Sequence, residues 1–150
     1  MERAPWILLP PSKAKSPGGE RGPWADEPHR HPELDGARHL VLAALGDALR
    51  AGAGPELLGV NGAALERATA ADLAADTAPT RAAALRYTGV LYQTLDVDTL
   101  PGAARRRLGG RVRIFSGLWG VVSATDPIPD YRLDMSATLP GLGSLTAFWR

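Results

Sequence analysis

The sequence predicts a mixed α/β or α+β fold in which a small mixed sheet packs against helices, within one domain spanning residues 1–150. An apolar run at 6–9 and an alternating stretch at 111–115 are typical of strands. Residues 33–51 instead repeat apolar side chains at helical spacing. Because the sequence indicates only two or three strands, the sheet should be small.

The first element is a short strand over 6–9, which we expect to be buried because all four of its residues are apolar. Pro10 and Pro11 end it, since neither can donate a ladder hydrogen bond. Residues 16–32 follow and contain seven prolines or glycines among mixed charges. This composition is typical of a loop, and we expect a flexible one.

The longest helix is expected over 33–51, because apolar residues recur there every three or four positions. Gly52 and Gly54 come next and are typical of a helix end. The buried face of this helix should consist of Leu34, Ala37, Leu40, Val41, Ala44, Leu45 and Ala48.

Shorter helices are expected further along the chain. The alanine-rich residues 62–76 should be helical in pieces, and Thr80 is placed to cap a helix over 81–86. A short helix is also expected over 101–108.

The sheet should form when the chain returns after this last helix. Gly109 and Gly110 are expected to turn the chain into the strand at 111–115. That strand and the one at 6–9 should share a sheet, with the helix over 33–51 covering it.

Composition excludes several classes of protein. The 150 residues contain no cysteine, which excludes a disulfide scaffold, a thiolate nucleophile and a cysteine-ligated metal, and fits a reducing cytoplasm. The N-terminal stretch is neither a signal peptide nor a membrane span. The net charge is only +1, so any attraction to nucleic acid needs a local basic patch. No cofactor or membrane partner is indicated, and the oligomeric state is left open.

Three blocks of sequence carry a family resemblance. Pro10-Pro11-Ser12-Lys13 follows the first strand, and Gly89-x-x-Tyr92 lies mid-chain. The third block is a Ser-Gly-Leu-aromatic-Gly stretch at 116–120 followed by Asp126, Tyr131, Arg132, Leu133 and Met135. In order and spacing these blocks resemble the YaaA family of peroxide-stress proteins, also called DUF328 or UPF0246.

The resemblance implies a bacterial, cytoplasmic protein that helps cells to resist hydrogen peroxide and limits free intracellular iron. It also implies mixed strands and helices around a basic cleft, a helix-hairpin-helix-like element and binding to double-stranded DNA. Family members continue past Arg150. We therefore expect the N-terminal part of a YaaA-like fold, truncated at the C-terminus, as the final aromatic pair also suggests.

A pocket for an anion is expected beside Lys13. A lysine held by prolines at the end of a strand loses little entropy on meeting an anion, and the resemblance places Lys13 on the family's own lysine. Ser116, Tyr131 and Arg132 should face the same pocket. The alternative is that Lys13 is a solvated loop residue and that Tyr131 and Arg132 only fasten an extended segment. We interpret Lys15 as a solvated lysine.

A basic segment offers a second candidate surface. Residues 81–113 contain seven arginines and two aspartates, a local charge of +5. Arginine neutralises DNA phosphates and binds them in bidentate fashion. A solvated helix end, where cations are favourable, is the alternative. The predicted DNA-contacting residues here are Arg105, Arg106, Arg107, Arg111 and Arg113.

The stretch LPGLGSLTA, residues 139–147, fits the hairpin of a helix-hairpin-helix motif. Gly141 and Gly143 would permit a tight turn with bare backbone N–H groups, and a helix from Ser144 would add its positive end, so the three residues are predicted to bind phosphate. A plain turn before a C-terminal helix is the alternative.

Two functional hypotheses remain open. The chain is either a protein that binds double-stranded DNA non-specifically through phosphates, or an enzyme acting on a nucleotide or damaged base with Lys13 as nucleophile or base. No metal site is predicted, because His29, His31 and His39 lie mostly in the proline-rich loop and are expected to be solvated.

Overall fold

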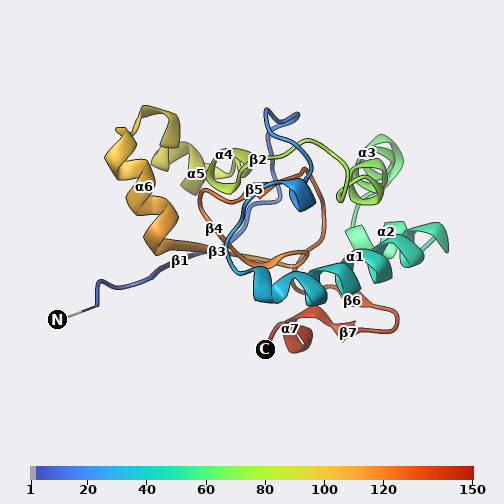
Figure 1. Cartoon of the computed structure of the whole chain (residues 1–150). Coiled ribbons are helices and arrows are strands. Elements are labelled where there is room, and N and C mark those ends of the chain that lie inside the picture. Colours follow the sequence, from blue (N-terminus) through green and yellow to red (C-terminus); the bar gives the residue numbers. More distant parts are fainter. Residues whose placement is uncertain (1–2) are drawn as a thin grey trace.

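A three-stranded sheet lies at the centre of the computed structural model, which describes residues 3–150 (Figure 1). Its order is β1-β3-β4, formed by Ile7–Leu9, Val112–Ser116 and Gly120–Ser123. β1 runs parallel to β3, and β3 runs antiparallel to β4. The small mixed sheet with packed helices that the sequence predicts is therefore confirmed.

The strand register separates a buried face of the sheet from an open one. Leu9 pairs with Ile114, which pairs in turn with Val122, and the last two side chains are fully buried. Successive side chains alternate between faces, so Leu8 and Phe115 point the other way, and both are exposed. The core therefore lies on one side of the sheet.

The expectation of a buried first strand was wrong. Ile7 is 49% exposed and Leu8 is 58% exposed. The reason is topological, because in the described part of the chain β1 pairs with β3 alone and forms the edge of the sheet. An apolar run indicates a strand, but it does not show which face or edge of that strand packs against the rest of the protein.

The sequence indicated no second strand in the glycine-bearing segment after β3, yet β4 forms there. Gly117, in the turn between the two strands, has no room for a side chain, since a Cβ would lie 2.6 Å from the carbonyl oxygen of Leu133. Trp119 ends the turn fully buried, with its ring centroid 4.8 Å from that of Trp24. The hairpin is thus locked against the rest of the core.

Helix α1 (Asp35–Arg50) confirms the longest predicted helix, but Leu40, which was expected on its buried face, is 55% exposed. It places the fully buried Arg38 against the outer edge of β4, where Nε donates to the carbonyl of Trp119 and Nη2 to that of Val121, at 2.9 and 2.7 Å. These carbonyls lie on the side of β4 away from β3, so α1 flanks the sheet edge, where the sequence predicted a helix over its face. Arg38 satisfies edge groups that would otherwise be unpaired.

Gly52 ends α1 as predicted, in the left-handed conformation with φ +86°. The amides of Gly52 and Ala53 return to the carbonyls of Leu49 and Ala48, a pattern that uses the last free acceptors of a helix. Two further helices follow, α2 (Gly54–Leu58) and α3 (Gly62–Leu73).

The helix predicted over 81–86 begins later than expected. Arg81–Ala82 forms β2, which pairs antiparallel with β5 (Pro127–Ile128), and only Ala83–Arg86 is helical, as α4. Thr80 does not cap this helix, because its hydroxyl donates to the carbonyl of Gly22 at 2.7 Å.

The basic segment forms α6 (Gly102–Arg111), reached through α5 (Val90–Leu95) and the short helix η3 (Val97–Thr99). The turn predicted at 109–110 is absent, since α6 passes directly into β3. The last carbonyls of a helix have no intrahelical donor. Here the carbonyl of Gly109 accepts hydrogen bonds from Ser123 Oγ and Arg113 Nη1 instead.

The proline-rich loop contains two short helices, η1 (Trp24–Asp26) and η2 (Pro32–Leu34). Trp24 anchors it to the core and stacks on His29, with a centroid distance of 4.6 Å. The loop is therefore fastened at its middle, and its predicted flexibility stays a prediction. The chain ends in a hairpin of β6 (Thr138–Leu139) and β7 (Gly143–Ser144), followed by α7 (Leu145–Phe148).

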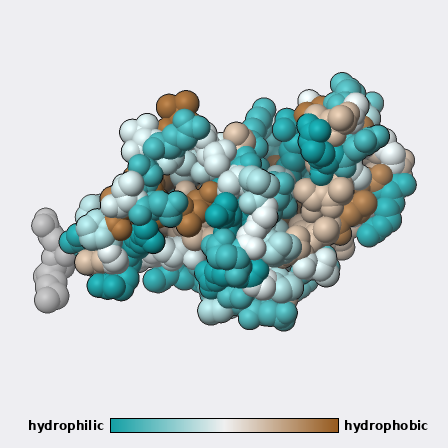
Figure 2. Space-filling view, turned by 90° about the horizontal axis from the view of Figure 1, so that it is seen from above, coloured by the Kyte–Doolittle hydropathy of each residue, from teal (hydrophilic) through white to brown (hydrophobic). Residues whose placement is uncertain are grey.

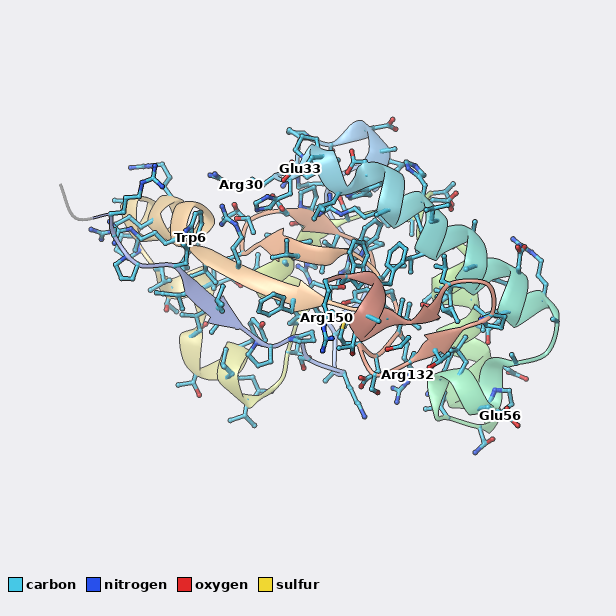
Figure 3. All side chains as sticks on the ribbon, turned by 90° about the horizontal axis from the view of Figure 1, so that it is seen from below. Trp6, Arg30, Glu33, Glu56, Arg132 and Arg150 are labelled. Carbon is cyan, nitrogen blue, oxygen red and sulfur yellow. The ribbon has the colours of Figure 1, made fainter. Side chains whose placement is uncertain are left out.

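The elements lie along one axis, with α6 at one end, α2 and α3 at the other, and the sheet between (Figures 1 and 3). On the face shown in Figure 2, apolar side chains form small separate patches among hydrophilic ones. No helix among residues 3–150 is long and apolar enough to cross a membrane.

We expect Arg38→Met to lower the free energy of unfolding by about 2–4 kcal/mol, because it leaves buried strand-edge carbonyls without donors. Urea unfolding measures this change. Arg50→Met is the matched control, since Arg50 lies on the same helix but is exposed, and it should cost less than about 0.5 kcal/mol. Equal losses in the two variants would contradict the proposed role of Arg38.

Candidate anion-binding site

The loop that carries both lysines of the chain is fixed from several sides. It leaves β1 through Pro10, whose carbonyl accepts a hydrogen bond from the Tyr92 hydroxyl. Lys15 then forms an antiparallel bridge with Tyr87, and the amide of Thr88 donates to the carbonyl of Ala14 at 3.0 Å. The two lysines therefore stand on a backbone with little freedom.

Three buried hydroxyls form the floor beneath this loop. The Tyr131 hydroxyl lies 2.7 Å from that of Tyr87 and 2.7 Å from Ser116 Oγ, which also accepts the amide of Trp119 at 3.1 Å. Burial raises the pKa of Tyr131 to about 12 and that of Tyr87 well above its ordinary value. Both phenols therefore stay protonated at neutral pH and act as hydrogen-bonding groups.

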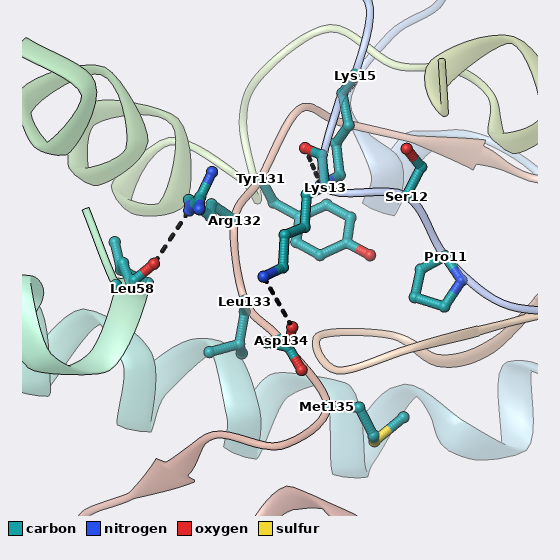
Figure 4. A pocket seen from close by; sticks show the side chains of 11 residues that line it. Pro11, Ser12, Lys13, Lys15, Leu58, Tyr131, Arg132, Leu133, Asp134 and Met135 are labelled. Atoms are coloured by element: carbon teal, nitrogen blue, oxygen red, sulfur yellow. Dashed lines mark hydrogen bonds and ion pairs between the residues drawn. The ribbon is translucent and has the colours of Figure 1, made fainter. Parts of the chain in front are cut away.

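Two adjoining cavities open above this floor, of about 370 and 220 Å³. Their linings share four residues, which we call the cleft residues: Lys13, Lys15, Tyr131 and Arg132. In Figure 4 the Lys13 side chain reaches across the Tyr131 ring toward Asp134, while Arg132 turns the other way toward Leu58.

Lys13 lies where the sequence predicts, at the mouth of the cleft. Its side chain is 76% exposed, and its Nζ lies 3.9 Å from Asp134 Oδ2. The pKa of Asp134 is lowered mainly by hydrogen bonds from Ser136, and Lys13 adds a smaller effect. A solvated ammonium with one loose partner is well suited to meet a phosphate.

Lys15 is the cleft residue that the sequence analysis misjudged, because it is half-buried where a solvated side chain was expected. Its Nζ lies 4.3 Å from the centroid of the Tyr131 ring and 5.7 Å from that of Tyr87. Burial lowers the pKa of Lys15 to about 8, and the charges of Asp130 and Asp72 partly oppose this shift. Nothing in the local sequence separates Lys15 from Lys13, since the tyrosines come from distant segments.

Asp72, on α3, is a further site residue that the sequence analysis did not name. It is 4% exposed, and its Oδ1 accepts the backbone N–H of Arg132 at 2.7 Å. Its Oδ2 is buried without a hydrogen-bond partner among residues 3–150. Burial raises the pKa of Asp72 to about 7, despite the N–H of Arg132 and the charge of Lys15. A signal existed, since Asp72 follows the buried Ala68 by one helical turn.

The structure brings the predicted pocket residues together, with one difference of role. Lys13, Tyr131 and Arg132 line the cleft, whereas Ser116 is fully buried beneath Tyr131 and holds its hydroxyl. Arg132 is partly committed, because its Nε donates to the carbonyl of Leu58 at 3.1 Å.

The predicted DNA-contacting arginines of α6 lie away from the cleft, since α6 is at one end of the molecule and Arg132 lies nearer its middle (Figure 3). Arg106, Arg107 and Arg111 are exposed. Arg105 is half-buried, and its guanidinium donates to the carbonyls of Val97 and Asp98.

Arg113 does not belong to an exposed basic surface. It is 6% exposed, donates to the carbonyls of Gly109 and Val112, and donates from Nε to His31 Nε2 at 2.9 Å. Its guanidinium also covers the Trp6 ring at 4.4 Å. Arg113 therefore joins β3 to α6, to His31 and to Trp6. Its guanidinium is occupied by these contacts and does not face solvent.

The predicted phosphate-binding turn is a β-hairpin in the structure. Gly141 and Gly143 adopt the left-handed conformation, with φ of +84° and +82°, as the sequence led us to expect of a tight turn. Strand β6 precedes the turn where a helix-hairpin-helix motif has a helix, and α7 after it has only four residues. Ser144 caps α7 by accepting the amide of Ala147. Phosphate contact by these residues stays a prediction.

His29 and His31 were expected to be solvated, but both side chains are partly buried and lie beside carboxylates. His29 is 11% exposed and lies 3.1 Å from Asp35, and His31 Nδ1 lies 3.0 Å from Glu33. Among residues 3–150 there is no group of three or more His, Cys, Asp and Glu side chains placed to hold a metal ion.

Known families and proteins are similar to this chain over nearly its whole length. The family described as "Peroxide stress protein YaaA" matches residues 6–150. A UPF0246 protein of Streptomyces coelicolor is 42% identical over 149 residues, which cover 96% of this chain and 56% of that protein. UPF0246 proteins of Corynebacterium glutamicum and Corynebacterium efficiens are also 42% identical, over 89% and 93% of this chain and 52% and 55% of their own. The chain thus spans about half the length of these curated relatives.

We expect Asp72→Asn to stabilise the protein at pH 8 by about 1–3 kcal/mol, because it keeps the acceptor for Arg132 and removes an ionisation that opposes folding. The raised pKa means that the wild type binds this proton more tightly when folded. Its free energy of unfolding should therefore contain a component that falls as pH rises from about 4 to about 7 and then levels off.

Urea unfolding of the two proteins between pH 4 and pH 8 measures this component as their difference. Asp76→Asn, which alters an exposed carboxylate just beyond α3, should keep the wild-type fall. A fall that persists in Asp72→Asn would assign it to another group.

Proposed function

The chain belongs to the peroxide stress protein YaaA family, and from that premise we propose that it binds double-stranded DNA through backbone phosphates held at Lys13, Lys15 and Arg132. The observation that carries this proposal is the convergence of these three cations on one cleft from segments more than a hundred residues apart.

The charge of the cleft supports an anionic ligand. Arg67 adds a fourth cation to the smaller cavity, whereas Asp130 and Asp134 are the carboxylates in the two linings. Lysine and arginine side chains supply most of the non-specific affinity of proteins for DNA. A net charge of +1 for the whole chain means that this attraction is local.

Contact through phosphates implies little reading of base sequence. The exposed Arg106, Arg107 and Arg111 of α6 offer a second, separate set of phosphate contacts, and the turn at Gly141, Gly143 and Ser144 offers a third. Arg105 and Arg113 support their segments in this proposal, because their guanidinium groups already have backbone partners.

Membership of a peroxide-stress family supports a proposed biological role. A cytoplasmic protein that covers DNA during peroxide stress limits oxidative damage, and the associated limitation of intracellular iron belongs to the same proposal. Protection of DNA and lowered iron are complementary, because iron converts peroxide into species that attack the duplex.

A second candidate function is an enzyme that acts on a nucleotide or a damaged base. It is favoured by the burial and the lowered pKa of the Lys15 amine. The sequence pointed to Lys13 for this role, but Lys13 is mostly exposed, whereas Lys15 is half-buried and has a pKa lowered to about 8. A desolvated lysine beside other cations is an activated nucleophile. Lys15 therefore replaces Lys13 as the candidate reactive residue.

Lys13→Ala should weaken binding to a duplex and lower the slope of log K against log salt by about one ion, because it removes one phosphate contact. A salt titration followed by fluorescence anisotropy measures both. Arg50→Ala is the matched control, since Arg50 is similarly exposed and has a single carboxylate partner at 3.6 Å but does not line the cleft. Equal slopes for the two variants would remove Lys13 from the binding surface.

Replacing Arg106 and Arg107 by Ser should lower the same slope by up to about two ions if α6 also contacts the duplex. These two residues are chosen because they are exposed, so their loss tests charge without disturbing the hydrogen bonds of Arg105. An unchanged slope would restrict DNA contact to the cleft.

A further inference from the structure

The two lysines of the chain stand two residues apart in contrasting environments. Lys13 is exposed and faces Asp134. Lys15 is packed over the Tyr131 ring, and its ammonium makes a long hydrogen bond of 3.4 Å to the carbonyl of Lys13. A lysine that is needed only for its charge gains nothing from this burial, because desolvation works against the charged form.

The surroundings of Lys15 Nζ suit a reactive amine. The backbone bridge to Tyr87 fixes the position of Lys15, and its side chain lines both cavities. The hydroxyl chain from Tyr87 through Tyr131 to Ser116 holds the aromatic floor still. A nucleophile on a rigid support needs little reorganisation to meet its target.

We propose that Lys15 Nζ captures an aldehyde on a phosphate-bearing ligand by forming an imine, and that in DNA this ligand is the ring-opened sugar of an abasic site. The choice of DNA rests on the proposed function. The aldehyde is the natural partner, because lysine amines activated in this way react with carbonyl groups to give Schiff bases.

The neighbours of Lys15 explain why the aldehyde should carry phosphate. Lys13, Lys15 and Arg132 line the same cleft, so that a sugar held by its phosphates at Lys13 and Arg132 would present its carbonyl carbon to Lys15. An abasic nucleotide has no base to stack or pair, and the cleft then needs to accommodate only a sugar and its phosphates.

The step balances without another reactant. The neutral amine of Lys15 attacks the aldehyde carbon, and a nitrogen-bound proton passes to the carbonyl oxygen to give a carbinolamine. Loss of the hydroxyl group together with the remaining proton on Nζ, as water, leaves a carbon–nitrogen double bond to Nζ. No oxidant or reductant is consumed, and the reverse reaction with water releases the ligand.

Charged groups from three segments set the fraction of neutral amine. Asp130 and Asp72 favour the ammonium, while burial and the cations Arg132 and Arg86 favour the amine, with burial the largest effect. Tyr87 and Tyr131 stay neutral. The pKa of about 8 leaves an appreciable fraction of reactive amine near neutral pH, whereas an ordinary lysine, with a pKa of about 10.4, has very little.

Borohydride trapping tests the inference, because the reagent reduces an imine to a stable secondary amine. The full chain is incubated with a duplex containing one abasic site, reduced, and separated on a denaturing gel. We expect a covalent protein–DNA adduct, with peptide mass spectrometry placing the modification on Lys15. An adduct confined to the α-amine of the chain would overturn the inference, since that amine also reacts near neutral pH.

Lys15→Arg is the decisive variant, because it keeps the positive charge and the contact with Tyr131 but has no nucleophilic amine. It should lose trapping by about tenfold or more and still bind an intact duplex. Arg50→Lys is the matched control, because Arg50 is exposed and lies outside both cavity linings, and it should retain trapping. Equal trapping by the two variants would overturn the inference, as would trapping by the wild type that does not rise between pH 6.5 and about 8.

A small phosphorylated aldehyde, deoxyribose 5-phosphate, separates this inference from DNA binding. Trapping of this probe on Lys15 by a chain that does not bind duplex DNA would support the reactive lysine and reject the proposed function. Duplex binding with no trapping of either probe would support the proposed function and overturn the inference.

Discussion

The hydrogen bonds that join Ser116, Tyr131 and Tyr87 hold the site together. They connect the end of β3 to the segment after β5 and to the segment after α4. Each hydroxyl is buried, so each needs its partner. The ring of Tyr131 is fixed as a result, and the lysine loop and both cavities are arranged around it.

This arrangement keeps two ionisable groups in unfavourable surroundings. Lys15 and Asp72 both have pKa values shifted toward their neutral forms by burial. Replacing either with an apolar residue would relieve that desolvation. A protein selected only for stability has no use for such a pair, and groups of this kind concentrate at functional sites. The site therefore lowers the stability of the fold. The hydrogen bonds of Arg38 and the buried face of the sheet offset this cost.

The sequence predicted the parts of this molecule that depend on local pattern. The helical period of apolar residues predicted α1, and the alternation of apolar residues predicted β3. The sequence block that contains Tyr131 and Arg132 located one wall of the cleft. The predictions that were wrong depended on neighbours distant in sequence. Gly109 continues a helix because Ser123 takes its carbonyl, and Lys15 is desolvated because two tyrosines surround it.

The parallel pairing of β1 with β3 also has a consequence in time. Ile7 cannot pair with Val112 until the ribosome has added Val112. At 5–20 residues per second this takes roughly 5–20 s after Ile7 is made. Until then the strand and the lysine loop behind it have no sheet to join, and Tyr131 is made later still. The cleft therefore cannot form until the ribosome has passed Tyr131. A pause in translation between these two strands would lengthen the period in which an apolar strand is exposed to other chains.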